Sequence, residues 1–193
     1  EFRRVLFRSR RSEIIHKMEE NGVHIGLLPI RKENQADSTA TLERIRKNGW
    51  DCCEVIEDPE YLFLGSGHPL ALTGEITPQM LAQVPLGTYS HVNDDNWLLF
   101  GHYFSGEAGF RCHSKDAILQ YVAQNRCAAI FPRFTSQYEY FVSQGAVQPV
   151  MVHGLDFGHA TFLLVHQSGK SLLREEQSVV CALKRYFKDC TCK

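Results

Sequence analysis

The sequence has no long hydrophobic segment. No apolar run approaches the roughly 20 residues that a membrane-spanning helix requires. The first residues also lack the apolar stretch and the small-residue cleavage site of a secretory signal peptide. With 44% hydrophobic and 22% charged residues, the composition is that of an ordinary folded protein. We therefore predict a cytoplasmic location.

Sequence motifs of common enzymes are also missing. Neither the G-x-S-x-G of serine hydrolases nor the H-E-x-x-H of zinc proteases occurs, and no two carboxylates have the spacing of a catalytic pair. His153, His159 and His166 follow one another at six and seven residues, which neither a helix nor a single strand gathers into one cluster. We predict no catalytic residues and no cofactor, and we keep a small metabolic enzyme as an alternative.

The seven cysteines include no C-x-x-C pair. In a cytosolic protein this scatter predicts reduced thiols and no disulfide framework. Cys190 and Cys192 lie beyond the last helical pattern, where we expect exposed and oxidisable thiols. A zinc site built from these two thiols and histidines is the alternative. Because the usual ligand spacings are absent, we predict no metal site.

Charge is distributed unevenly along the chain. Residues 1–12 hold five arginines and one glutamate, whereas the remaining residues hold 16 basic and 21 acidic side chains. Such an acidic body does not favour nucleic-acid binding. We interpret residues 1–11 as a basic tail or an assembly scar. A DNA-binding arm is the alternative, because basic tails bind phosphates.

Short apolar segments alternate with helical patterns. We expect strands at 5–7, 23–28, 50–64, 86–91, 110–112, 127–131, 147–152 and 160–166, and helices at 13–21, 39–48, 78–83, 95–104, 115–125, 135–145 and 172–187. Ser12, Ser38, Ser114 and Thr135 are the predicted N-caps. Pro29 is expected to close one strand, and Asp58-Pro59 to interrupt the next. This alternation predicts an α/β fold with a mainly parallel sheet.

The stretch GSGHPLA, residues 65–71, follows the apolar run YLFL. It lacks the lysine of a P-loop and the glycine spacing of a dinucleotide-binding loop, so it is not a phosphate loop. Its glycines permit a sharp turn, and Pro69 restricts the exit. His68 either orients this turn through a hydrogen bond or contacts a ligand.

Five segments in order resemble the effector-binding domain of LysR-type transcriptional regulators. They are SEIIHKMEENGVHIGLLPI, YLFLGSGHPLA, ITPQMLAQVPLGTYS, FRCHSKDAILQYVAQNRCAAIFPRF and TFLLVHQSGKSLLREEQSVVCALKRYF. The resemblance covers residues 12 to about 188. One departure is His24, which stands where the family has an aspartate. The turn HPLA alone is a weak signal, but five segments in the family's order are a strong one.

The resemblance implies a two-lobed, type 2 periplasmic-binding-protein-like fold with two crossover strands. Residues 12–65 plus 161–193 would form lobe one, and residues 66–160 lobe two. The first strand and helix of lobe one, and the DNA-binding helix-turn-helix before them, are expected to be missing. DNA contact would then depend on that missing N-terminal domain. A solute-binding protein of the same fold is the alternative, which the lack of a signal peptide argues against.

The resemblance also implies a ligand site between the lobes and a homodimer or higher homo-oligomer. The ligand-binding residues it suggests are Pro29, Ile30, Ser66, Gly67, His68, Ser90, His91, Ser114, Phe131 and Pro132. Ser114 begins a helix, whose free N–H groups favour an anion. Ser114 would otherwise be a simple cap. We therefore predict a small-molecule effector, anionic if Ser114 binds it.

Overall fold

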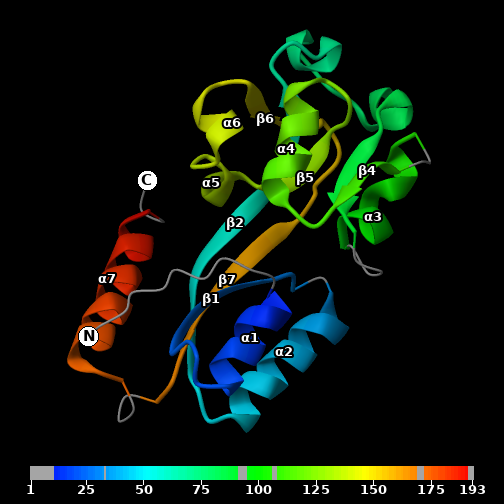
Figure 1. Cartoon of the computed structure of the whole chain (residues 1–193). Helices are drawn as coiled ribbons and strands as arrows, with labels where there is room; N and C mark the ends of the chain where they lie inside the picture. The colour runs from blue at the N-terminus through cyan, green and yellow to red at the C-terminus, as the bar shows by residue number, and fades with distance from the viewer. Residues whose placement is uncertain (1–10, 33, 91–94, 106–107, 169–171, 191–193) are drawn as a thin grey trace. The chain divides into compact units, whose positions relative to one another are not determined.

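The computed structural model describes residues 11–32, 34–90, 95–105, 108–168 and 172–190. The chain folds into two compact units, which we call unit 1 and unit 2. Unit 1 comprises residues 1–57 and 160–193, and unit 2 comprises residues 58–159. Strands β2 (Asp51–Gly65) and β7 (His159–His166) contribute residues to both units (Figure 1).

Unit 1 is a sheet with helices on both faces. Strand β1 (Ile25–Ile30) pairs antiparallel with β7, which lies next to β2. Helices α1 (Arg11–Glu19) and α2 (Gln35–Lys47) cover one face, and α7 (Arg174–Cys190) covers the other (Figure 1). Alternation along β7 explains the two layers, because Leu163 and Val165 pack with α1 and α2 whereas Leu164 packs with α7.

Pro29 lies inside β1, so the prediction that it closes the strand is wrong. His24 accepts a hydrogen bond from the Gln167 amide at 3.1 Å, so even-numbered residues here direct their backbone groups toward β7. Pro29 faces the opposite way, where its missing N–H removes no ladder bond. Its carbonyl oxygen accepts a bond from Arg11 Nη1 at 3.0 Å. Among the described residues β1 pairs with β7 alone, so proline stands on a sheet edge.

Unit 2 contains the second half of β2 and most of the shorter elements. These are the strands β3 (Leu86–Tyr89), β4 (Ala108–Cys112), β5 (Ala129–Pro132) and β6 (Val147–Val150), the α-helices α3 (Asp95–Phe100), α4 (Lys115–Ala123), α5 (Arg133–Ser136) and α6 (Tyr140–Ser143), and the 3-10 helices η1 (Pro69–Leu72), η2 (Pro78–Gln83) and η3 (Gly101–Tyr103). Alternate residues of β2 and β5 supply two cores, one around Leu62 and Ile130 and the other around Phe63 and Phe131.

The described strand pairs are mostly antiparallel, so the prediction of a mainly parallel sheet is wrong. Strand β1 with β7, and β2 with both β5 and β6, are antiparallel, whereas β3 with β4 is parallel. Parallel neighbouring strands require a crossover connection, usually a helix. Strand β2 instead continues from unit 1 into unit 2, so no such crossover sets its direction relative to its neighbours.

Strand β2 is also continuous through Asp58-Pro59, where an interruption was expected. Its partner β5 ends at Pro132, opposite Glu60, so Pro59 has no ladder bond to lose on that side. Residues 60–65 pair with β5 and β6, which places them in unit 2. The unit boundary therefore lies at residue 57, earlier than the predicted lobe boundary at residue 65.

Most other elements agree with the sequence pattern, and the exceptions are local. Helices α1 and α2 begin at Arg11 and Gln35, so Ser12 and Ser38 lie inside them and are not N-caps. The helix predicted at 135–145 is divided into α5 and α6, because Glu139 between them has an extended backbone with φ −69° and ψ 143°. The predicted strand at 5–7 lies outside the described residues.

No helix in the described part of the chain is both long enough and apolar enough to cross a membrane.

Gly65 at the end of β2 should tolerate no side chain. A Cβ atom there would lie 2.5 Å from the Val122 carbonyl oxygen and would overlap the side chain of Asn125. We expect Gly65→Ala to lower the free energy of unfolding by about 1–3 kcal/mol. The matched control is Gly67→Ala, whose nearest atom would lie 3.4 Å away and which should cost less than about 0.5 kcal/mol. Urea denaturation compares them, and equal midpoints would contradict this packing.

Candidate functional site

The N-terminus of α4 and the ends of β3 and β5 form the candidate site in unit 2. Ser114 has extended backbone and its hydroxyl accepts a hydrogen bond from the Ala117 amide at 3.4 Å. Ser114 is therefore the N-cap, as the sequence predicted, and its side chain is exposed. The start of this helix supplies N–H groups and the positive end of the helix dipole, which favour an anion.

Lys115 follows the cap, and its ammonium group is held inside unit 2. Lys115 Nζ donates to Ser136 Oγ at 2.8 Å and lies 3.3 Å from Glu139 Oε1. It also lies 4.9 Å from the centre of the Phe131 ring, within the range of a cation–π contact. A positive charge in the first turn opposes the helix dipole, so the carboxylate of Glu139 offsets an unfavourable position.

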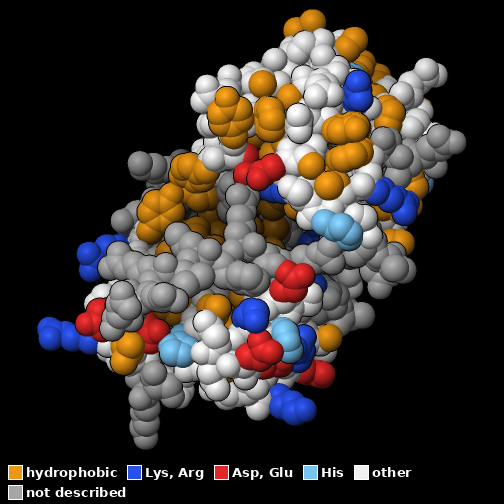
Figure 2. Space-filling model, in the orientation of Figure 1, with side chains coloured by type: hydrophobic (Ala, Val, Ile, Leu, Met, Phe, Trp, Pro, Cys, Tyr) orange, Lys and Arg blue, Asp and Glu red, His pale blue; other side chains and the backbone are white. Residues whose placement is uncertain are grey.

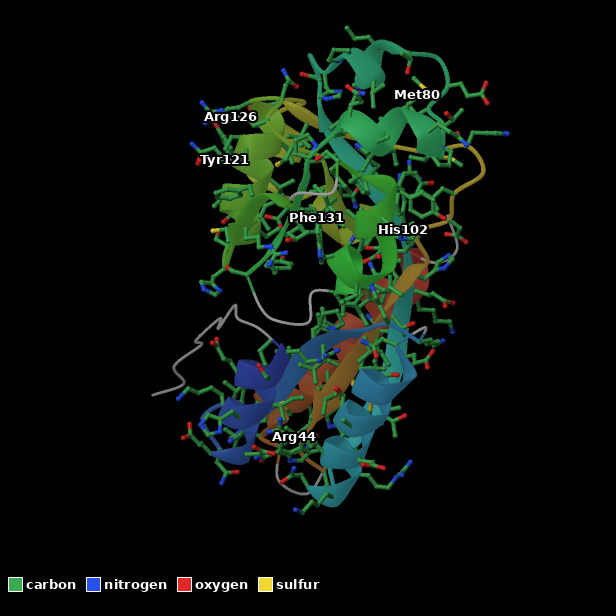
Figure 3. The ribbon with its side chains drawn as sticks, turned by 90° about the vertical axis from the view of Figure 1, so that its right-hand side faces the viewer. Arg44, Met80, His102, Tyr121, Arg126 and Phe131 are labelled. Atoms are coloured by element: carbon green, nitrogen blue, oxygen red, sulfur yellow. The ribbon has the colours of Figure 1, made fainter. Side chains whose placement is uncertain are left out.

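Aromatic rings pack beside Lys115. The Phe131 ring is buried and meets Phe63 and Tyr89 edge-on, with centroid distances of 6.0 and 6.1 Å. Figure 3 shows Phe131 in the interior of unit 2, whereas Tyr121 and Arg126 lie together at its outer side. Contacts with Phe63 and Tyr89 hold the Phe131 ring in position, so the ring is a fixed aromatic partner for the ammonium group of Lys115.

Carboxylates dominate the charge of unit 2. Residues 58–159 hold nine aspartates and glutamates but only four arginines and lysines, and Lys115 is the single lysine. Asp58 is completely buried and accepts a hydrogen bond from the Phe134 amide at 2.8 Å. Glu60 is also buried, opposite Pro132. An acidic unit repels anions at long range, so anion binding here depends on local donors.

The structure separates Ser66, Gly67 and His68 from this site. Their segment follows Gly65, which pairs with Val147 and packs against Asn125 beyond the C-terminal end of α4. Helix α4 has nine residues, so at 1.5 Å per residue its two ends are roughly 13 Å apart. Strand β2 carries these residues to the far end of unit 2, and they do not meet Ser114.

His68 orients the turn through a hydrogen bond, as one of the two interpretations of GSGHP proposed. Its Nδ1 accepts a bond from the Leu70 amide at 3.2 Å and thereby caps η1. Burial lowers the pKa of His68, because a partly buried imidazole loses hydration when it becomes charged.

The remaining predicted ligand-binding residues have different positions. Pro29 and Ile30 belong to unit 1, where Pro29 is exposed and the Ile30 side chain is part of the core. Ser90 is exposed and follows β3, and its amide donates to the Cys112 carbonyl at 3.0 Å. His91 lies outside the described residues. Of the predicted set, Ser90, Ser114, Phe131 and Pro132 belong to the site in unit 2.

Sequence reasoning missed the buried polar residues of the site. Lys115, Ser136 and Glu139 were not singled out, although the structure brings them together directly after the Ser114 cap, and Asp58 was considered only as a break in a strand, although it is buried and accepts a bond from the Phe134 amide. One signal was present, because a lysine directly after an N-cap is unfavourable by itself and indicates a partner. The identity of that partner depends on the bend at Glu139, for which the sequence has no marker.

In the described part of the chain, no three histidine, cysteine, aspartate or glutamate side chains are grouped to hold a metal ion. Burial raises the pKa of the Cys127 thiol to about 12. Cys52 and Cys181 are exposed free thiols. The side chains of Cys190 and Cys192 lie outside what the structure describes.

Comparison with known proteins decides the family. A family model described as "LysR substrate binding domain" matches residues 7–188. The chain belongs to this family. The match begins inside the stretch that we interpreted as a tail. The resemblance and the type 2 periplasmic-binding-protein-like fold are confirmed. LysR domains of this kind are regulatory effector-binding domains, which is the class of function that the sequence predicted.

Solved structures of other LysR-type domains share the fold at low identity. The CcmR regulatory domain of Synechocystis PCC6803 in complex with 2-PG is 15% identical, with a TM-score of 0.64, over 93% of this chain and 80% of that one. The effector binding domain of QuiR in complex with shikimate is 14% identical, with a TM-score of 0.64, over 95% and 80%. The reduced OxyR regulatory domain from Pseudomonas aeruginosa is 12% identical, with a TM-score of 0.63, over 94% and 80%. No curated protein sequence matches the chain.

The lowered pKa of His68 predicts that the stability of this domain depends on pH. The unfolded state binds more protons than the folded state below the ordinary pKa of 6.5, so the His68 contribution to stability is lost as pH falls through that value toward the lower folded pKa. We expect an NMR titration of His68 with a midpoint below 6.5. His68→Asn should reduce the loss of stability as pH falls below 6.5; an unchanged slope would show that His68 does not contribute.

Two aspartates provide a matched test of the buried carboxylate. Asp58 and Asp156 each accept one backbone N–H at 2.8 Å, from Phe134 and Gly158, but Asp58 is buried whereas Asp156 is exposed. Asp58→Ala leaves a donor without solvent, so we expect a loss of about 1–3 kcal/mol in unfolding free energy. Asp156→Ala should cost less than about 1 kcal/mol, because water replaces the carboxylate. Equal losses in urea denaturation would argue against the role of Asp58.

Proposed function

We propose that this LysR domain senses a small anionic effector and that unit 2 binds its anionic group at the N-terminus of α4. The observation that carries the proposal is the ammonium group of Lys115, held 4.9 Å above the Phe131 ring directly after the Ser114 cap. A hydroxyl, a helix N-terminus and a cation within one helical turn are the donors that a carboxylate or phosphate accepts.

The class of ligand follows from these donors and has support from the relatives. QuiR is solved with shikimate, which carries a carboxylate, and CcmR with 2-PG. Tyr89 and Pro132, which are half-buried, supply apolar surface at the end of the sheet where the Phe131 ring is buried, and this surface suits the carbon skeleton of a metabolite. We propose Ser90, Ser114, Phe131 and Pro132 as the contacts from unit 2.

An additional amino group on the effector would suit the acidic character of unit 2. Asp58, Glu60 and Glu139 are buried carboxylates of unit 2, and Glu60 lies opposite Pro132 at the end of β5. An ammonium group near them would gain favourable Coulomb energy. Amino acids are therefore the second ligand class to test.

Regulation rather than catalysis is the proposed outcome of binding. A ligand that binds one arrangement of the protein better than another shifts the population toward it. We propose that effector binding changes the arrangement of the units and of the subunits in a homo-oligomer, and that a DNA-binding domain elsewhere in the regulator transmits this change to transcription. The proposal includes no catalytic step and no cofactor. It places the protein in the cytoplasm.

A thermal-shift screen tests the ligand class. Small carboxylates, phosphorylated acids including 2-PG, shikimate and amino acids are each added to the protein. A ligand that binds the folded state raises the melting temperature. At a ligand concentration of one hundred times the dissociation constant, the free energy of unfolding increases by about 2.7 kcal/mol. We expect stabilisation by at least one anionic compound and none by its neutral amide. Equal effects of acid and amide would contradict an anion site.

Ser114→Ala tests the position of the site with the compound found in that screen. The lost hydroxyl should weaken binding by roughly 1–2 kcal/mol, measured by calorimetric titration. The matched control is Ser66→Ala, since Ser66 is exposed at the far end of unit 2 and should leave affinity unchanged. If Ser66→Ala weakens binding and Ser114→Ala does not, the effector binds near the GSGHP turn instead.

A further inference from the structure

We propose that the carboxylate of Glu139 competes with a bound anion for the ammonium group of Lys115, and that this competition sets the affinity of the domain for anions. The inference rests on the proposed anion site at α4 and adds its regulation. Glu139 holds the ammonium group of Lys115. An anionic effector shares that ammonium with Glu139 and weakens the ion pair.

The ion pair is built into the interior of unit 2. The Lys115 and Glu139 side chains are 17% and 9% exposed, and their charged atoms lie 3.3 Å apart. Ser136 is completely buried and accepts a bond from Lys115 Nζ at 2.8 Å. Three elements thus converge on one ammonium group, since Lys115 comes from α4, Ser136 from α5, and Glu139 from the bend before α6. Low exposure makes the interaction stronger and less sensitive to salt than a surface pair.

Competition follows from the charges that are available. Residues 58–159 include nine carboxylates and only four lysines and arginines, and the ammonium group of Lys115 lies 3.3 Å from Glu139 Oε1. An anion close enough to contact Lys115 therefore lies near the carboxylate of Glu139, and like charges in a partly buried site repel one another. Removal of the Glu139 charge should consequently raise anion affinity, whereas loss of a merely structural contact would lower it or leave it unchanged.

The same ion pair links the site to the surface of unit 2. Glu139 lies between Tyr138 and Tyr140, whose side chains are 65% and 69% exposed. Figure 2 shows hydrophobic side chains gathered on the surface where α6 lies. A weaker ion pair loosens the bend that holds Tyr138 and Tyr140, so anion binding at α4 would alter an exposed aromatic surface. Such coupling between two places is reciprocal.

Titration with inorganic phosphate at constant ionic strength tests the inference on the full chain. Backbone amide resonances of residues 115–117 report binding at α4, and those of residues 136–140 report the state of the Glu139 bend. In the wild type we expect both groups to shift with the same midpoint. Glu139→Gln should lower the midpoint for residues 115–117 by about fivefold or more and reduce the response of residues 136–140. Lys115→Met should abolish saturable shifts, and Lys115→Arg should restore them.

Two further variants exclude trivial explanations. Glu75→Gln removes an exposed carboxylate of unit 2, 66% exposed, and should leave the phosphate midpoint unchanged. Ser136→Ala removes the second anchor of Lys115 and should also raise affinity, which provides an independent test if Glu139→Gln does not fold. If Glu139→Gln and Ser136→Ala bind phosphate as the wild type does, the competition is wrong while the anion site stands. If phosphate shifts residues 115–117 in no folded variant, the anion site and the inference both fail.

Discussion

Strand β2 must satisfy its backbone hydrogen bonds in two different places, and the rest of the structure depends on this constraint. Its first half lies beside β7 in unit 1, and its second half pairs with β5 and β6 in unit 2. Unpaired backbone groups in a buried strand would cost several kilocalories per mole in total, so both units have to form around one segment. The constraint applies residue by residue. Pro59 is accommodated within β2 because the ladder with β5 ends at the next residue, Glu60, so the missing N–H of Pro59 removes no bond to β5.

Pairing along β2 also decides which residues share a site. Since β2 and β5 are antiparallel, Glu60 lies beside Pro132 whereas Gly65 has moved on to Val147. One end of unit 2 therefore receives the ends of β3 and β5 and the start of α4, and the opposite end receives the GSGHP turn. The two ends have different chemistry. The first contains a helix N-terminus and a buried ion pair, and the second contains a tight glycine packing and a capping histidine.

The ion pair of Lys115 with Glu139 gives this first end its particular properties. A helix start favours anions, but a lysine in the first turn is unfavourable unless a partner offsets its charge. Glu139 offsets it, and we propose that it also competes with an anion for the ammonium group of Lys115. Unit 2 holds nine carboxylates and only four lysines and arginines, so we propose that the cation of Lys115 supplies the local attraction for an anion. In our proposal the same ion pair couples ligand binding to the bend between α5 and α6.

The sequence alone determined the family, the approximate elements and the Ser114 cap, because these depend on local patterns. Hydrophobic alternation, caps and turn residues act over a few neighbours. The N-cap before α4 occurs as predicted, and the hydrogen bond of His68 agrees with one of its two interpretations. Only the tertiary structure decided the direction of the strand pairs, the continuation of β2 beyond Asp58 and the position of Pro29 inside β1. It also brought Lys115, Ser136 and Glu139 together and separated Ser66 from Ser114. These features depend on which distant segments pair, and on backbone groups that face toward or away from a neighbour, which local sequence does not encode.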